Sequence, residues 1–273
     1  MRFNDKVVVV TGASSGIGEQ ACIDFAKQGA KVAVIARSKE KIENIANKIT
    51  ENYHTRALAT ACDVSKKHQV LSMSKQVLDE FEHVDILVNN AGFAIFGNVK
   101  DLTIEELEDQ LSTNLLGTIY CTKAFLPSML IRRAGHIVNV ASVAGSIGIP
   151  GMAAYCASKF ATLGFSQSLY HELSGTGVGV TAVSPITVKT NFFDHQSFKK
   201  IRPNYTPVAL SAQHVSKAIL RAANSRRMEI IVPFYVRGAV WFTQTFPYLI
   251  NPFLGSAFRR QLKRVEQEDQ SIQ

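Results

Sequence analysis

The sequence predicts an α/β protein with a doubly wound, mostly parallel sheet of about seven strands. Short apolar runs alternate with amphipathic segments of helical length, which is the pattern of repeated strand–helix–strand units. No linker rich in proline, glycine or serine interrupts this alternation between residues 1 and 190. The length of 273 residues and the apolar fraction of 46% suit a globular core and exclude a low-complexity chain.

The predicted strands are short runs rich in valine and isoleucine. The first, KVVVVT at 6–11, has four consecutive valines before Gly12, which is typical of a strand buried on both faces of a parallel sheet. The other strands are predicted at 31–36, 55–64, 84–90, 136–142, 177–185 and 228–233.

The predicted helices lie between these strands. In the first helix, Ile17, Ala21 and Phe25 fall on one face, and Gly29 ends the helix. Further helices are predicted at 38–52, 66–81, 103–130 and 152–173.

A glycine-rich turn, TGASSGIG at 11–18, joins the first strand to the first helix. Gly12 permits a tight exit from the strand, Gly16 lets the backbone approach a pyrophosphate, and Gly18 lets the helix pack closely on the sheet. The free N–H groups of the helix N-terminus attract phosphate. The turn therefore predicts a dinucleotide site made by Gly12, Ser14, Ser15, Gly16, Ile17 and Gly18. The alternative is a turn with no ligand.

The end of the second predicted strand favours NADP over NAD. A carboxylate that binds the ribose 2′-hydroxyl usually selects NAD, but here Ala36 is followed by Arg37 and no carboxylate occurs until Glu40. A guanidinium binds a 2′-phosphate by charge and by paired hydrogen bonds. The alternative is that Arg37 is a solvated residue that opens a helix.

Four further features occur in a characteristic order: NNAG at 89–92, Asn114, Ser142, and Tyr155 four residues before Lys159. With the glycine-rich turn, they resemble the short-chain dehydrogenase/reductase family over about residues 5–190. The resemblance implies a Rossmann-like fold and hydride transfer between a nicotinamide cofactor and a carbonyl carbon.

The catalytic set can be argued in part from the residues. Tyr155 and Lys159 are one helical turn apart, so we expect the ammonium to lower the pKa of the phenol, which then serves as general acid and base. Ser142 ends the strand predicted at 136–142, where its hydroxyl would bind the substrate oxygen. The resemblance implies that Lys159 also binds the nicotinamide ribose and that Asn114 holds a proton-relay water. The alternative is a polar core at the sheet edge.

The resemblance implies further cofactor contacts. Asp63 and Val64 would contact the adenine, although Asp63 could instead cap a helix. The ribose and carboxamide contacts fall on Asn90, Ala91, Gly92, Pro185, Val188 and Thr190. The chain departs from the family at Ile186, where glycine is usual. We expect a β-branched residue there to be strained if the backbone needs a positive φ, which would disturb nicotinamide binding.

The C-terminal part differs in composition. Residues 199–237 hold eight Lys and Arg against Glu229 alone, and residues 238–258 are uncharged and rich in aromatic residues. Prolines 247 and 252 disfavour a membrane span, so the segment is interpreted as a substrate lid, a subunit contact or a surface that contacts anionic lipid. We therefore divide the chain into a Rossmann-like NADP-binding and catalytic domain at 1–235 and an aromatic, basic C-terminal extension at 236–273.

The expected substrate is a small-molecule apolar carbonyl compound or alcohol, such as a hydrophobic ketone or a steroid-like alcohol, with Phe93, Ser142 and Ile149 in its cleft. The resemblance implies a homodimer or homotetramer. No nucleic-acid module is recognisable, so we expect no nucleic-acid partner. Two other functions stay open: a nucleotide sensor that acts through its C-terminal surface, and an NADP-dependent epimerase or dehydratase.

The four cysteines are 35 to 59 residues apart in sequence, which indicates free thiols in a reducing compartment. Because the N-terminus lacks a long apolar stretch, we expect a cytoplasmic protein, with membrane-surface association open. The seven histidines are scattered, so we expect no metal.

Overall fold

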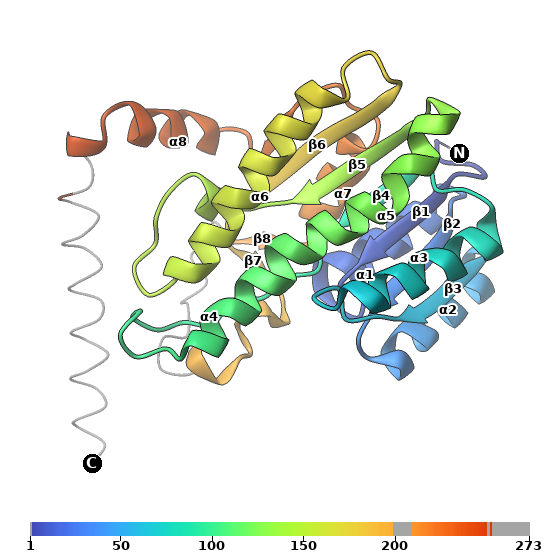
Figure 1. Cartoon of the computed structure of the whole chain (residues 1–273), viewed down its shortest axis with the longest axis horizontal. Coiled ribbons are helices and arrows are strands. Elements are labelled where there is room, and N and C mark those ends of the chain that lie inside the picture. Colours follow the sequence, from blue (N-terminus) through green and yellow to red (C-terminus); the bar gives the residue numbers. More distant parts are fainter. Residues whose placement is uncertain (1, 199–208, 250–251, 253–273) are drawn as a thin grey trace.

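The computed structural model describes residues 2–198, 209–249 and 252, and its core is one seven-stranded sheet (Figure 1). The strand order is β3-β2-β1-β4-β5-β6-β9, and every neighbouring pair is parallel. The predicted fold class is thus confirmed. The strands are β1 (Val7–Thr11), β2 (Lys31–Ala36), β3 (Ala57–Ala61), β4 (Ile86–Asn89), β5 (Gly135–Val140), β6 (Val178–Pro185) and β9 (Glu229–Val232).

The strand order reverses between β1 and β4. From β1 the chain adds β2 and β3 on one side, then crosses back to β4 and builds the other side. In such sheets, ligands bind beyond the carboxyl ends of the strands at this reversal. The glycine-rich turn follows β1, and the NNAG segment spans the end of β4, so both lie at that place.

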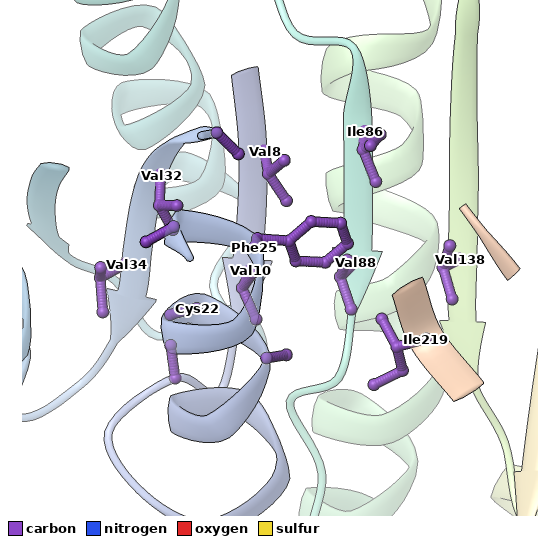
Figure 2. Close-up of a cluster of buried hydrophobic side chains, with 14 of the residues drawn as sticks. Val8, Val10, Cys22, Phe25, Val32, Val34, Ile86, Val88, Val138 and Ile219 are labelled. Atoms are coloured by element: carbon purple, nitrogen blue, oxygen red, sulfur yellow. The ribbon is translucent and has the colours of Figure 1, made fainter. Parts of the chain in front are cut away.

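Helices cover both faces of the sheet. The helices α1, α2 and α7 contribute to one apolar cluster, and α3, α5 and α6 contribute to the other. Figure 2 shows the first cluster, where Phe25 of α1 lies near Val10 of β1 and Ile219 of α7 lies near Val138 of β5. The helices are α1 (Gly16–Ala26), α2 (Lys39–Tyr53), α3 (Lys67–Phe81), α4 (Ile104–Leu111), α5 (Gly117–Arg132), α6 (Ala153–Glu172), α7 (Ala212–Ala222) and α8 (Val236–Thr245).

The valine run of β1 explains why this strand lies at the centre. Val8 and Val10 belong to one apolar cluster, whereas Val7 and Val9 belong to the other. All four are at most 1% exposed. Successive side chains of a strand point to opposite faces, so only a continuous apolar run can fill both cores.

Two elements differ from the sequence expectations. The helix expected at 103–130 is α4 and α5 joined by a π-helical turn at Ser112–Leu116, which contains Asn114. The helix α7 was not predicted, although its buried residues Val215, Ala218, Ile219 and Ala222 follow helical spacing. It completes the core beside α1.

The region after β6 forms smaller elements. A separate two-stranded sheet pairs β7 (Val188–Lys189) with β8 (Leu210–Ser211). Short 3-10 helices lie at Val143–Gly145, Asn191–Phe193 and Gln196–Phe198.

The C-terminal extension is described only in part. The helix α8 begins at Val236, while residues 250–251 and 253–273 of the extension lie outside the described residues, as do Lys199, Lys200 and Arg202 of the basic stretch. Among the described helices, none has the length and hydrophobicity to cross a bilayer.

The four cysteines are unpaired and buried, which agrees with the expected free thiols. Burial raises the pKa of each thiol above its usual value.

Candidate active site

The glycine-rich turn is folded so tightly that side chains would not fit. Gly12 and Gly16 have left-handed backbone, with φ of 64° and 60°. A Cβ on Gly12 would lie 2.7 Å from Cα of Ala91, and a Cβ on Gly18 would lie 2.4 Å from the carbonyl oxygen of Gly12. The turn therefore presents backbone rather than side chains, as a pyrophosphate requires, and its residues fit a dinucleotide cofactor.

The N-terminus of α1 has donors available for phosphate. Ser15 is the N-cap residue, and its hydroxyl makes no capping hydrogen bond within the part of the chain that the structure describes. Ser14 precedes it in the turn, and Ile17 lies in the first helical turn. Helix N-termini carry unpaired N–H groups and a partial positive charge, so this end of α1 suits an anion.

Hydrogen bonds from the residues that follow β4 hold the glycine-rich turn in place. The Thr11 hydroxyl accepts hydrogen bonds from the backbone N–H groups of Asn90 (3.0 Å) and Ala91 (3.1 Å). The Asn90 amide donates back to the carbonyl oxygens of Thr11 (3.0 Å) and Gly12 (3.2 Å). Asn90 and Ala91 therefore brace the glycine turn. Sequence reasoning did not single out Thr11, although a polar residue ending an apolar strand was a visible signal.

Asn114 joins the NNAG loop to the helical layer. Its amide donates to the carbonyl of Phe93 (2.9 Å) and to the Ser158 hydroxyl (3.0 Å), and its Oδ1 accepts from the N–H of Phe93 (3.0 Å). A Cβ on Gly92 would lie 3.0 Å from Oδ1 of Asn114 and 3.5 Å from Nζ of Lys159. Asn114 therefore positions the loop beside the lysine. The proton-relay role implied by the resemblance stays a prediction.

Lys159 is buried beside Tyr155. Its ammonium donates to the carbonyl oxygen of Val140 (2.8 Å) and lies 5.7 Å from the centre of the Tyr155 ring. Burial lowers the pKa of Lys159 from its usual 10.5 to about 8, because the interior disfavours the charged form.

Tyr155 is 8% exposed and hydrogen-bonds the Ser142 side chain. Burial raises the pKa of Tyr155 from 10 to about 12, and this effect outweighs the lowering by the Ser142 hydrogen bond. The expectation that Lys159 lowers this pKa is therefore wrong for the protein without cofactor. The phenol is protonated at neutral pH.

Ser142 lies between the tyrosine and the end of β6. Its hydroxyl accepts a hydrogen bond from the N–H of Ala144 (3.1 Å) and lies 3.4 Å from the carbonyl oxygen of Pro185. It caps the 3-10 helix that follows β5. The structure thus brings Ser142, Tyr155, Lys159 and Asn114 together, as the sequence predicted.

The strain expected at Ile186 is not found. Ile186 is not among the described residues with positive φ, and its N–H donates to the carbonyl of Val232 (3.0 Å), which extends the β6–β9 pairing. An extended backbone suits a β-branched residue. Val188 is buried in β7, and Thr190 lies against the glycine turn, 3.2 Å from where a Cβ on Gly16 would stand.

The adenine end of the predicted site lies at the carboxyl ends of β2 and β3. Arg37 follows β2, is exposed, and makes no ion pair with another described residue. The Asp63 carboxylate accepts hydrogen bonds from the N–H (3.0 Å) and hydroxyl (2.8 Å) of Ser65. Lys66 is the N-cap residue of α3, so Asp63 does not cap that helix. Val64 is buried and packs on Gly117.

An aromatic cluster packs against Tyr155. Phe192 contacts the Tyr155 ring at 5.5 Å between ring centres, and Phe193 contacts both Phe192 and Phe198 at 5.1 Å. Phe96 contacts Phe198 at 5.8 Å. We call the four phenylalanines, Phe96, Phe192, Phe193 and Phe198, the aromatic cluster. Sequence reasoning missed Phe192, Phe193 and Phe198, although they closely follow Thr190.

The two apolar residues predicted for the substrate cleft differ in position. Ile149 packs against the apolar core that contains Tyr155 and Phe198, whereas the side chain of Phe93 is not part of that core as far as the described residues go. Phe93 takes part in the site through its backbone bonds to Asn114.

A model of the family described as short chain dehydrogenase matches residues 6–200. The chain belongs to the short-chain dehydrogenase family. Relatives of this short-chain dehydrogenase include an uncharacterized oxidoreductase of Staphylococcus epidermidis, 35% identical, with 81% of this chain and 92% of the relative covered. Dehydrogenase/reductase SDR family member 7B of Xenopus tropicalis is 32% identical over 96% of this chain and 88% of the relative.

Solved structures of other short-chain dehydrogenases share the fold. One from Burkholderia phymatum, in complex with NAD, has a TM-score of 0.82 and 27% identity, and the match covers 91% of this chain and 96% of the other. An alcohol dehydrogenase from the archaeon Thermococcus sibiricus, complexed with 5-hydroxy-NADP, has a TM-score of 0.76 and 29% identity, covering 84% and 96%. This short-chain dehydrogenase is therefore an oxidoreductase with a nicotinamide cofactor site.

Proposed function

We propose that this short-chain dehydrogenase is NADP-dependent and interconverts an apolar carbonyl compound and its secondary alcohol, with Tyr155 as general acid and base. One observation carries the proposal. Tyr155 lies between polar groups that suit a reacting oxygen, Ser142 and Lys159, and an apolar surface, the aromatic cluster. Such a tyrosine can serve an oxygen whose substituents are apolar.

The bound nicotinamide would supply or accept the hydride, while the protein holds and orients both reactants. The glycine turn would hold the pyrophosphate with backbone N–H groups, because only backbone fits there. Lys159 lies next to Gly92, where its ammonium would meet the ribose. Pro185, Val188 and Thr190 lie on the segment that would hold the carboxamide.

The proton would be handled by the side chains of the protein. In reduction, the Tyr155 hydroxyl would donate its proton to the carbonyl oxygen, and in oxidation the phenolate would remove it. Ser142 would hold the same oxygen through its hydroxyl. In the protein without cofactor, burial raises the pKa of Tyr155 to about 12, so the phenol is the dominant form and holds the proton that reduction requires.

The preference for NADP rests on Arg37. An exposed guanidinium after β2, free of ion pairs among the described residues, would bind a 2′-phosphate by charge. Solved relatives hold either NAD or an NADP derivative, so the preference has to be argued from this side chain.

Titration calorimetry of NADPH and NADH tests the cofactor preference. The wild type should bind NADPH more tightly, and Arg37→Ala should weaken NADPH binding by roughly ten- to a hundredfold while leaving NADH unchanged, as loss of charge-assisted hydrogen bonds implies. The control Lys48→Ala removes an exposed lysine of α2 and should change neither affinity. Equal binding of both cofactors by the wild type would contradict the preference.

Turnover of a carbonyl panel tests the chemistry. Tyr155→Phe should keep the NADPH affinity and lose roughly a hundredfold or more in kcat, because general acid–base catalysis contributes that much. Phe192→Ala should lower kcat/KM for apolar ketones by about tenfold, as loss of a half-buried aromatic contact implies, with little change for a small polar carbonyl. Unchanged turnover by Tyr155→Phe would overturn the assignment of the acid and base.

A further inference from the structure

The helix α8 and its flanks expose an unusual number of large apolar side chains. At this end of the described chain their exposed fractions run from 42% to 92%. Within α8 itself, only Val240 is buried. We call this set the aromatic surface: Phe234, Tyr235, Trp241, Phe242, Phe246, Tyr248 and Leu249.

The aromatic surface is set apart from the main body. The helix α8 follows the edge strand β9 and projects beyond the sheet and its covering helices (Figure 1). Trp241 and Phe242 each pack on Phe246, at 6.4 and 5.3 Å between ring centres. Contiguous exposed apolar surfaces of this kind mark interaction sites.

The charged residues that flank the aromatic surface in the sequence have one sign. No Asp or Glu occurs in the sequence between Glu229 and Glu266. The same stretch holds five basic residues, Arg237, Arg259, Arg260, Lys263 and Arg264, of which Arg237 is described and exposed. Positive charge next to exposed aromatics complements an anionic, partly apolar partner.

The length of α8 disfavours a membrane span, and the composition of the aromatic surface favours a bilayer surface as the partner. Its ten residues extend about 15 Å, half of the roughly 30 Å hydrocarbon core. Tryptophan and tyrosine prefer the membrane–water interface, where one end of the ring is apolar and the other is wet. A short helix with two large aromatic residues and the basic Arg237 suits a segment lying in the interface.

The helix α8 also contacts the loop behind the active site. The Gln244 amide donates to the carbonyl oxygen of Ser146 (3.4 Å), directly after the 3-10 helix that Ser142 caps. A surface that binds α8 therefore lies close to the loop that leads to Ser142.

The structure assigns the aromatic surface, residues 234–249, as a docking surface for an anionic lipid bilayer. Docking would place the active-site loop near lipid, from which an apolar substrate could be taken. This last step rests on the proposed function, whereas the docking itself does not.

Trp241 provides a direct test because it is the only tryptophan of the chain and is 61% exposed. The full-length protein is mixed with vesicles of phosphatidylcholine and phosphatidylglycerol at low salt. We expect a blue shift of the emission, quenching by lipids brominated near the headgroup, and flotation with the vesicles. Pure phosphatidylcholine or high salt should weaken all three, because salt screens the basic residues.

Substitutions separate the aromatic surface from other apolar residues. The double variant Phe234→Glu, Tyr248→Glu keeps Trp241 as the probe and should weaken vesicle binding by at least about tenfold, a loss of roughly 1.4 kcal/mol. The control Leu71→Glu changes an exposed leucine of α3, 54% exposed, and should bind like the wild type.

Three outcomes would contradict the proposal that the aromatic surface docks on lipid. The first is a wild type that neither shifts its emission nor floats with anionic vesicles. The second is equal loss of binding in the Leu71→Glu control. The third is self-association that buries Trp241 without lipid, seen by sedimentation, which would make this face a contact between copies. NADPH titration on the same samples tests the proposed function and does not depend on vesicle binding. The two measurements therefore show separately whether the docking proposal or the proposed function is wrong.

Discussion

The side chain of Asn114 makes hydrogen bonds in both directions with the backbone of Phe93: Oδ1 accepts from its N–H at 3.0 Å, and Nδ2 donates to its carbonyl at 2.9 Å. Asn114 stands in the π-helical turn between α4 and α5, where the helix is locally widened. The pair connects two segments that reach the same site, and Gly92 is held between Asn114 and Lys159. The Asn114 amide therefore helps to fix the loop beside the lysine, together with the bonds from Asn90 and Ala91 to Thr11.

Asn114→Ala is expected to lower both stability and turnover. Asn114 is 1% exposed, so the variant leaves the N–H and carbonyl of Phe93 without their partner. Each buried polar group left unpaired costs roughly 1–3 kcal/mol, which thermal unfolding would detect. Asn98→Ala removes an exposed side chain that bonds only Asp101 among the described residues and should leave the Tm unchanged. A wild-type Tm for Asn114→Ala would show that the pair is dispensable.

The sheet and the catalytic set were predictable because their signals are local or repeated. The valines of β1 must fill two cores, and this leaves an unbroken apolar run in the sequence. Tyr155 and Lys159 are one helical turn apart, so a helix alone brings them to the same face. Gly12 and Gly18 accept no Cβ, which restricts these positions to glycine.

Other parts of the site depend on contacts between distant segments. Thr190 lies against Gly16 only because β6 and β1 end at the same edge of the sheet. The aromatic cluster joins Phe96 to Phe198, and no spacing in the sequence records that contact. The pKa of Tyr155 was predicted in the wrong direction because burial, which the sequence does not give, outweighs its hydrogen bond.

Lys159→Met is expected to stabilise the cofactor-free protein at neutral pH while abolishing activity. The pKa of Lys159 is 10.5 in the unfolded chain and about 8 in the folded protein. Between pH 8 and pH 10.5 the unfolded chain therefore binds more protons than the folded protein. Burial of the lysine therefore costs roughly 3 kcal/mol below pH 8, and the cost disappears as the pH rises toward 10.5. In Lys159→Met, loss of the hydrogen bond to the carbonyl oxygen of Val140 offsets about 1 kcal/mol of the stability gained by removing the buried charge.

Denaturant unfolding of Lys159→Met and wild type from pH 7 to pH 10 measures this difference. The variant should be more stable by about 2 kcal/mol at pH 7, and its advantage should shrink steadily with rising pH. Lys123→Met, which replaces an exposed lysine of α5, should show no such trend. An advantage that is constant with pH would mean that Lys159 is not the group responsible.

Tyr155 is expected to remain protonated well above neutral pH in the cofactor-free protein. Its raised pKa, about 12, means that the phenolate is rare until the solution is strongly alkaline. Tyrosinate absorbance of the wild type and of Tyr155→Phe should therefore coincide up to about pH 10, the ordinary tyrosine range. If the two proteins differed by one full tyrosinate below that pH, burial would not raise the pKa of Tyr155, and the original expectation that Lys159 lowers this pKa would stand.

Two helical glycines provide a matched pair for testing the cofactor turn. Both Gly18 in α1 and Gly164 in α6 lie in helices. A Cβ on Gly18 would lie 2.4 Å from the carbonyl oxygen of Gly12, whereas a Cβ on Gly164 would meet no described atom within 4 Å apart from the neighbouring backbone of its own helix. Gly164→Ala should stabilise the protein by about 0.5–1 kcal/mol, because alanine favours helix.

Gly18→Ala should instead displace the turn, lowering the Tm and weakening NADPH binding together, since overpacking a close contact costs about 1–3 kcal/mol or more. Calorimetry of both variants with NADPH, alongside thermal unfolding, separates a general effect of alanine from the local clash. If Gly18→Ala bound NADPH like the wild type, the close approach of α1 to the strand end would not be what holds the cofactor turn in shape.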